Sequence, residues 1–213
     1  MQIQLQQVSP VFIEKEKVAG SGIWNGNISF NAAERIQIVA PSGSGKTSLI
    51  HFLYGMRKDY TGSILYDNAD IAGFDAEQFA TWRQKHISIV FQDLRLFTGQ
   101  TVLENIEIKR LLNPFHAESK VEEMARRLGI HNKLGKLCST CSYGEQQRIA
   151  IIRSLQQPFN FLLLDEPFSH LDDNNRKKAM ELMEEEAAAR NAAIILADLK
   201  KIEFFTADRT LTL

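Results

Sequence analysis

A short segment rich in glycine and serine, residues 40–47 (APSGSGKT), most constrains what this chain can fold into. It follows an apolar strand-like run at 35–39 and precedes Leu49 and Leu53, whose spacing predicts a helix. Small residues there let backbone N–H groups close around phosphate oxygens, and the N-terminal end of a helix favours an anion. The segment therefore predicts a phosphate-binding loop between a strand and a helix.

The two residues that end this loop carry its chemistry. Lys46 would reach the β- and γ-phosphates of a nucleotide, and the Thr47 hydroxyl would ligate Mg²⁺. The usual pattern opens with glycine whereas this one opens with Ala40, a change that matters only if the position needs a positive φ. The predicted nucleotide contacts of the loop are Ser42, Gly43, Ser44, Gly45, Lys46, Thr47 and Ser48.

A pair of carboxylates follows a second apolar run, residues 161–164. The carboxyl end of a strand in an α/β sheet is where ligands and metal-linked chemistry gather. Asp165 is expected to hold Mg²⁺ directly or through water, and Glu166 to act as the base that polarises an attacking water.

Composition excludes several classes of function. The chain has 213 residues with 25 basic and 26 acidic side chains, so its balanced charge does not indicate a nucleic-acid binder. No apolar run approaches the roughly 20 residues that span a bilayer, and the N-terminus lacks a signal-peptide pattern. We expect a soluble protein that reaches a membrane only through a partner.

Cys138 and Cys141 form a lone C-x-x-C, expected to be two ordinary reduced thiols.

The remaining pattern divides the chain into strand-rich and helix-rich parts. Residues 1–39 are predicted to form strands, because Ile3 and Leu5 alternate with polar neighbours, and 60–66 a hairpin strand. Residues 94–137 are predicted to be a helical insertion. Within it, Ser119 and Glu122 have the spacing of a capping box, and Gly129 is expected to end the helix.

Beyond the insertion, the α/β pattern resumes. The apolar runs 161–164 and 192–196 are typical of parallel strands buried on both faces. Between them a helix is predicted over about 173–190, with Glu184 to Glu186 as a solvated face. Its expected inner face consists of Ala179, Met180, Leu182, Met183 and Ala187.

Five segments in a fixed order resemble the nucleotide-binding cassette of an ABC transporter over nearly the whole chain. They are residues 40–47, 90–93 (VFQD), 141–148 (CSYGEQQR), 161–167 (FLLLDEP) and 169–172 (SHLD). The resemblance implies an α/β fold: a P-loop NTPase (RecA-like) core with an N-terminal antiparallel β subdomain and an inserted α-helical subdomain. Residues 1–213 would form one domain, with 1–93 and 149–213 as the core and about 94–148 as the insertion that carries the signature motif.

The resemblance also implies roles for particular residues. Gln92 would contact Mg²⁺ and water at the catalytic centre. Ser142, Gly144 and Glu145 belong to the signature motif, which in this family binds the γ-phosphate of the nucleotide held by the opposite subunit; Asp172 belongs to a loop that crosses the dimer interface. Phe12 is the candidate for stacking on adenine, and an ordinary core phenylalanine is the alternative. The run from Trp82 to Ile106 most resembles the lipoprotein-releasing and macrolide-exporting branch.

Two departures from the family pattern concern catalysis. The family has a histidine after the last buried strand, and residues 194–200 (IILADLK) contain none. One register puts Asp198 at that position, and neighbouring registers put Ala197 or Leu199 there. Losing one hydrogen-bond donor to a transition state typically costs about 10²–10³ in rate. In addition, Tyr143 replaces the first glycine of the signature and Cys141 replaces its leucine, while His170 is the one histidine near a motif.

These features predict an ATPase subunit that binds Mg-ATP between two cassettes arranged head to tail, as a homodimer or heterodimer. It would drive a separate transmembrane permease from the cytoplasmic face of the cell membrane, with no nucleic-acid partner. The alternative is an ATP-gated interaction module that dimerises without significant turnover. An ABC ATPase acting on DNA or ribosomes is disfavoured by the neutral charge and the absence of a basic tail.

Overall fold

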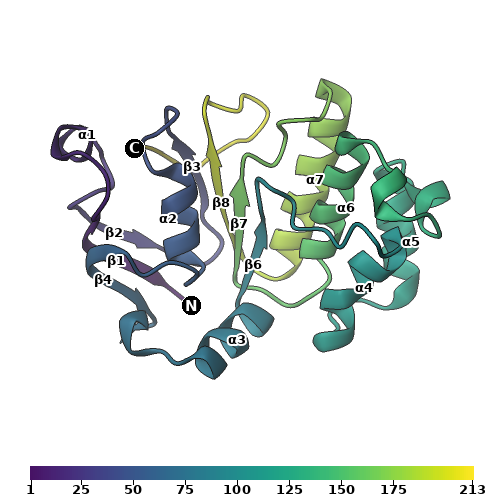
Figure 1. Ribbon diagram of the computed structural model, residues 1–213, viewed down its shortest axis with the longest axis horizontal. Helices are drawn as coiled ribbons and strands as arrows, with labels where there is room; N and C mark the ends of the chain where they lie inside the picture. Colours follow the sequence, from purple (N-terminus) through teal and green to yellow (C-terminus); the bar gives the residue numbers. More distant parts are fainter.

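The computed structural model describes the backbone of all 213 residues and every side chain except those of Lys15 and Lys17. Its strands form one parallel and one antiparallel sheet (Figure 1). Across the described residues, no helix combines the length and the apolar character needed to cross a bilayer.

The parallel sheet has the strand order β6-β7-β8-β3-β9. Its strands are β3 (Arg35–Val39), β6 (Ile87–Val90), β7 (Phe161–Asp165), β8 (Ala193–Asp198) and β9 (Arg209–Thr212). Along β7, Phe161 and Leu163 face the core that contains α2 (Lys46–Leu53), while Leu162 and Leu164 face the opposite core. That second core lies under α6 (Tyr143–Ser154) and α7 (Asp173–Ala189), as Figure 1 shows. The prediction of parallel strands buried on both faces is confirmed.

The antiparallel sheet has the order β2-β1-β4-β5. Its strands are β1 (Ile3–Pro10), β2 (Asn27–Phe30), β4 (Tyr60–Tyr66) and β5 (Ala69–Asp70), and the short helix α1 (Lys15–Ala19) follows β1. Ile3 and Leu5 are buried. The register between β1 and β4 shifts between Gln6 and Ser9, where Gly62 has a φ of +81° and packs so closely that a Cβ would lie 2.4 Å from the Gln7 carbonyl oxygen. Only glycine fits this bulge.

The helical part contains α4 (Val102–Leu112) and α5 (Glu118–Arg127) and packs against α6; α3 (Ala76–Lys85) precedes β6. A capping box does occur, at Thr101 and Glu104 of α4. The one predicted at Ser119 is wrong, because α5 begins at Glu118 and Ser119 already lies inside the helix. Gly129 ends the helix as predicted, with a φ of +69° and its N–H donating to the Arg126 carbonyl.

The acidic run on α7 is not uniformly solvated, and this corrects the prediction for Glu184 to Glu186. Glu186 is buried and accepts hydrogen bonds from Arg190 Nη1 at 2.6 Å, and its Oε2 lies 2.6 Å from His116 Nε2. Glu186 is next to Ala187 and three residues beyond Met183, so it falls within the buried stripe of the helix. The His116 and Arg190 contacts make its burial tolerable, since a buried charge needs partners.

Candidate nucleotide-binding site

The loop at residues 40–47 joins β3 to α2 and places Lys46 at the first position of the helix. Gly43 and Gly45 have φ values of +80° and +96°, and a Cβ on Gly45 would lie 2.5 Å from Ile13 Cδ1. Both glycines are therefore needed by the backbone path. Ala40 is buried and lies outside the left-handed region, so its methyl group does not disturb the loop.

The loop surrounds a cavity of about 350 Å³, the phosphate cavity. Most of residues 41–48 line this cavity, together with Gln92, Glu166 and Leu199. The N-terminus of α2 opens into it, the arrangement that favours a bound phosphate.

The three predicted catalytic side chains meet at this cavity. Lys46 Nζ forms a largely buried ion pair with Glu166 Oε1, and Gln92 Nε2 donates to the same oxygen at 3.3 Å. Glu166 has a φ of +46°, a conformation that is uncommon outside glycine. Its N–H donates to the Ala197 carbonyl at 2.9 Å, which ties this turn to β8. The fold therefore brings together residues that are far apart along the chain.

The predicted metal ligands adjoin the same cavity, and they suit Mg²⁺. Asp165 is 1% exposed, and no described residue donates a hydrogen bond to either of its carboxylate oxygens. The neighbouring Thr47 hydroxyl instead donates to Gln92 Oε1 at 3.2 Å. Burial raises the pKa of Asp165 to about 6, although the nearby positive charge of Lys46 acts to lower it. A buried carboxylate left without a partner, beside hydroxyl and amide oxygens, is the hard oxygen set that Mg²⁺ prefers.

A second cavity, of about 410 Å³, adjoins these metal-site residues. Thr47, Gln92 and Asp165 line one part of it, and Tyr143, Ser169 and His170 line another. The rings of Tyr143 and His170 pack edge to face with centroids 4.1 Å apart. His170 therefore shares a cavity with the predicted metal ligands.

At the end of β8, where the resemblance predicts the position of the family's histidine, neighbouring residues have different surroundings. Leu199 lines the phosphate cavity, whereas the Asp198 carboxylate accepts a hydrogen bond from the Leu199 N–H at 2.7 Å. Burial raises the pKa of Asp198. Of the three residues that alternative registers place at the histidine position, Leu199 is the one among the described lining residues of the cavity, while the Asp198 carbonyl accepts a hydrogen bond from the Ala40 N–H at 3.0 Å.

The signature segment forms the start of α6. Ser142 is the N-cap residue and forms a capping box with Glu145, whose pKa is lowered by the hydrogen bond from the Ser142 N–H. Gly144 packs against the 169–172 loop so tightly that a Cβ would lie 2.8 Å from the His170 carbonyl oxygen. Ser142, Gly144 and Glu145 do not line the phosphate cavity, whose described lining comes from other segments. Asp172 is the N-cap of α7, and its side chain accepts from the Asn175 N–H at 2.9 Å.

Gln147 connects these segments, and the sequence reasoning assigned it no role. Its Nε2 donates to the Glu166 carbonyl at 3.3 Å and to Ser169 Oγ at 3.4 Å. Its Oε1 accepts from the His170 N–H at 2.9 Å. It is fully buried. A glutamine placed inside an otherwise apolar helical stripe was the available signal, because a buried polar side chain requires partners.

Phe12 is 48% exposed, so the alternative that it is a core residue is wrong. It lies in the turn after β1, and the Arg57 guanidinium carbon is 4.3 Å from its ring centroid. An exposed aromatic ring with one face covered by a cation remains a suitable platform for a base.

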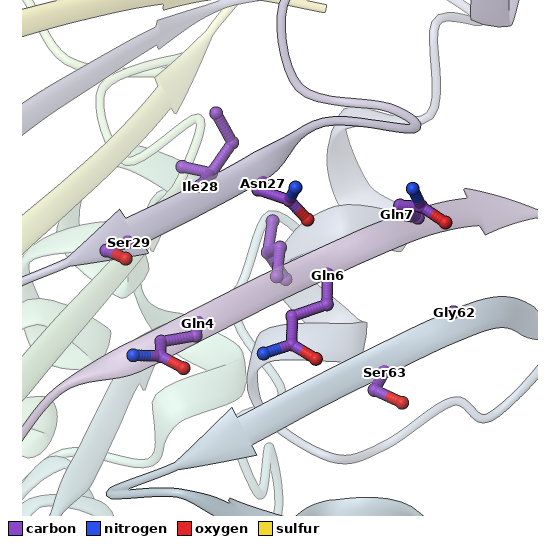
Figure 2. Close-up of a pocket in the computed structure, with 9 residues that line it drawn as sticks. Gln4, Gln6, Gln7, Asn27, Ile28, Ser29, Gly62 and Ser63 are labelled. Carbon is purple, nitrogen blue, oxygen red and sulfur yellow. The ribbon is translucent and has the colours of Figure 1, made fainter.

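Another hollow lies away from this site, on the antiparallel sheet (Figure 2). It measures about 610 Å³ and is lined mainly by amide and hydroxyl side chains such as Gln4, Gln6 and Ser63. No charged side chain is among its described lining residues, so it offers neither a phosphate nor a metal a counter-charge.

The free thiols of Cys138 and Cys141 are buried, and burial raises the pKa of Cys138 to about 11, which keeps that thiol protonated and unreactive.

The geometry defines the class: a P-loop fold with a nucleotide-binding cavity at the carboxyl ends of a parallel sheet. Comparison with known proteins agrees. A family model described as "ABC transporter" matches residues 24–169. The lipoprotein-releasing system ATP-binding protein LolD of Buchnera aphidicola is 34% identical over 171 residues, covering 78% of this chain and 75% of LolD. The ABC transporter ATP-binding protein YtrE of Bacillus subtilis is 30% identical over 173 residues, covering 80% of this chain and 75% of YtrE.

A longer relative and a solved structure extend the comparison. The macrolide export ATP-binding/permease protein MacB of Nitrosomonas europaea is 32% identical over 173 residues, and the match covers 26% of MacB. The dimeric ATP-binding cassette MJ0796, in a post-hydrolysis state with ADP and Pi, superposes with a TM-score of 0.83. That match has 24% identity and covers 99% of this chain and 94% of MJ0796, so it shows the fold. The chain belongs to the ABC transporter family, as an ATP-binding cassette.

Proposed function

We propose that this chain binds Mg-ATP at residues 42–48 and hydrolyses it, slowly, to drive a separate membrane permease. The observation that carries the proposal is the convergence of Lys46, Gln92 and Glu166 on the phosphate cavity, beside the partnerless carboxylate of Asp165.

The residues of the cavity have separate roles in binding the phosphates and in activating water. The N–H groups of the loop hold the phosphates, and Lys46 exchanges Glu166 for phosphate oxygens when a nucleotide enters. This exchange frees the Glu166 carboxylate to accept a proton from an attacking water, with Gln92 orienting that water. Mg²⁺, held by Thr47, Gln92 and Asp165, would neutralise charge on the phosphate oxygens.

The signature residues are proposed to act on a second cassette. Ser142, Gly144 and Glu145 lie outside the phosphate cavity of their own chain, and the N-terminus of α6 that they form suits a phosphate brought by a partner. Asp172 caps α7 at the end of the 169–172 loop that contacts Gly144, and it would lie at the same dimer interface. The partner is a second copy of this chain or a different cassette.

Slow turnover is proposed because the phosphate cavity lacks the expected histidine. Leu199 lines the cavity, its side chain has no hydrogen-bond donor, and its N–H already donates to Asp198. His170 lines the adjoining cavity and is the group available to take part of that role. If neither compensates, the chain is an ATP-gated module that closes on nucleotide without significant turnover.

The permease would supply the membrane-spanning part. LolD and MacB are named for lipoprotein release and macrolide export, and MacB is named as both ATP-binding protein and permease. We infer that this chain lies at the cytoplasmic face of a membrane and contacts the bilayer only through its permease, with no nucleic-acid partner.

Phosphate release from the purified chain with Mg-ATP tests the proposal. Turnover that is lost in both Lys46→Ala and Glu166→Gln supports hydrolysis at this site. The matched control is Glu181→Gln, an exposed carboxylate on α7, which should leave the rate unchanged. ATP binding that depends on Lys46 without turnover that depends on Glu166 would instead establish the gated module.

A further inference from the structure

Arg57 lies between Ser48, in the first turn of α2, and the exposed ring of Phe12, and nothing in its sequence context marks it for a role. It follows α2, and its guanidinium makes directed contacts on three sides. Nε donates to Asp59 Oδ1 at 2.9 Å and Nη2 donates to the other oxygen of Asp59. Nη1 donates to Ser48 Oγ at 3.0 Å. The guanidinium carbon lies 4.3 Å from the centre of the Phe12 ring.

These contacts fix the orientation of a flexible side chain. Asp59 holds the guanidinium at two nitrogens, a geometry that adds directional specificity to an ion pair. The backbone strengthens the arrangement, because the Val11 N–H donates to the Asp59 carbonyl at 3.2 Å and Pro10 pairs with Tyr60. The turn that carries Phe12 and the segment that carries Arg57 are thus held together.

Ser48 and Phe12 lie at opposite ends of this arrangement and would contact different parts of a nucleotide. Ser48 lines the phosphate cavity, whereas Phe12 is half exposed beyond it. A guanidinium fixed over one face of a ring leaves the other face for a base, and the cation–π contact limits the orientations of the ring. A platform already oriented costs less to order when a ligand binds.

We propose that Arg57 is a positioning residue for the nucleotide base: clamped by Asp59 and Ser48, it orients the Phe12 ring as a stacking platform at a fixed distance from the phosphate loop. The inference rests on the proposed binding of ATP. It assigns Arg57 an effect on the adenosine part of the ligand and none on the phosphate cradle.

Calorimetric titration of the full chain with Mg-ADP and with Mg-pyrophosphate separates the two parts of the ligand. Arg57→Gln is expected to weaken ADP binding about two- to five-fold, the range of an exposed cation–π contact, and to change pyrophosphate binding less than two-fold. Phe12→Leu, which keeps an apolar side chain and removes the ring, should show the same selectivity. The double variant should bind ADP no more weakly than Phe12→Leu alone, since Arg57 acts through the ring.

Lys58→Gln is the matched control. Lys58 carries the same charge one residue on, but its Nζ lies toward the carbonyls of Ala72 and Phe74, so both ligands should bind as in the wild type. Losses of ADP affinity that add in the double variant would overturn the proposal, as would an equal loss of pyrophosphate binding or tighter ADP binding in Arg57→Gln. If the wild type and Lys58→Gln bind neither ligand, the nucleotide-binding function itself fails.

Discussion

Lys46 and Glu166, which are 120 positions apart in the chain, form an ion pair inside the phosphate cavity. The groups proposed to hold the γ-phosphate and to activate water are thus paired with each other in the structure. If Lys46 binds the γ-phosphate as proposed, it must release Glu166, so phosphate binding would free the proposed catalytic base.

Glu166→Gln should lower the stability of the protein and increase the stabilisation that ADP provides. Removing the charge leaves a mostly buried Lys46 poorly compensated, which should destabilise the nucleotide-free protein by about 1–3 kcal/mol. ADP should raise the melting temperature of this variant more than that of the wild type, because the phosphates no longer compete with Glu166. Thermal melting with and without Mg-ADP measures both effects. An equal ADP shift in the two proteins would show that the ion pair does not oppose binding.

The buried group of His116, Glu186 and Arg190 should contribute strongly to stability. Glu186→Ala leaves Arg190 buried without its carboxylate and is expected to cost about 3–5 kcal/mol in the free energy of unfolding at neutral pH. Burial alone would raise the pKa of Glu186, but hydrogen bonds from His116 and Arg190 lower it below its usual value of 4.5. The stabilisation that the ionised Glu186 provides is therefore present above pH 4.5, and it should be lost as the pH falls through the lowered pKa.

Urea unfolding at several pH values checks this, with Glu185→Ala as the control. Glu185 is exposed and pairs with Arg127, so its loss should cost at most about 1 kcal/mol. Equal costs for the two variants would contradict the assigned importance of the buried group.

Lys109 on α4 should destabilise the protein while it is charged. Burial, with Arg153 and Arg83 nearby, lowers its pKa from 10.5 to about 8, and no described residue forms an ion pair with it. Lys109→Met is expected to stabilise the chain by about 1–3 kcal/mol at pH 7. Between about pH 8 and 10.5 the unfolded chain binds the additional proton, so wild-type stability rises and the advantage of the variant disappears.

Unfolding of Lys109→Met at pH 7 and pH 10 measures that change. Lys136→Met, at an exposed position, should stay within about 0.5 kcal/mol of the wild type at both pH values. A stabilisation by Lys109→Met that does not depend on pH would refute the electrostatic explanation.

Gly144→Ala should disturb the contact between the signature helix and the 169–172 loop. Alanine would favour the helix by about 1 kcal/mol in isolation, yet its Cβ would lie 2.8 Å from the His170 carbonyl oxygen. The loop must move, so we expect turnover to fall at least about ten-fold, since catalytic geometry tolerates little displacement. Phosphate release measures this, and Gly135→Ala, where a Cβ meets nothing within 4 Å, is the control. Equal rates for the two variants would show that the contact does not affect catalysis.

Local sequence patterns predicted the parts of the site that depend on local backbone. The glycines of residues 40–47 and the apolar strand before Asp165 have the predicted geometry, because φ restrictions and strand burial act over a few neighbouring residues. The same kind of reasoning misplaced the start of α5, where Ser119 had the spacing of a cap but Glu118 already lies in the helix. Several short stretches can satisfy a capping pattern, and packing selects among them.

The sequence by itself determined that this chain has a phosphate loop, a carboxylate pair at a strand end and the motif order of an ABC cassette. Only the tertiary structure decided which side chains meet: Lys46 with Glu166, Tyr143 with His170, Gln147 with the turn at Glu166, and Glu186 with His116 and Arg190. It also decided that Leu199, and not Asp198, lines the phosphate cavity. These contacts join residues distant in sequence, and their geometry depends on strand register and helix packing, which no local pattern encodes.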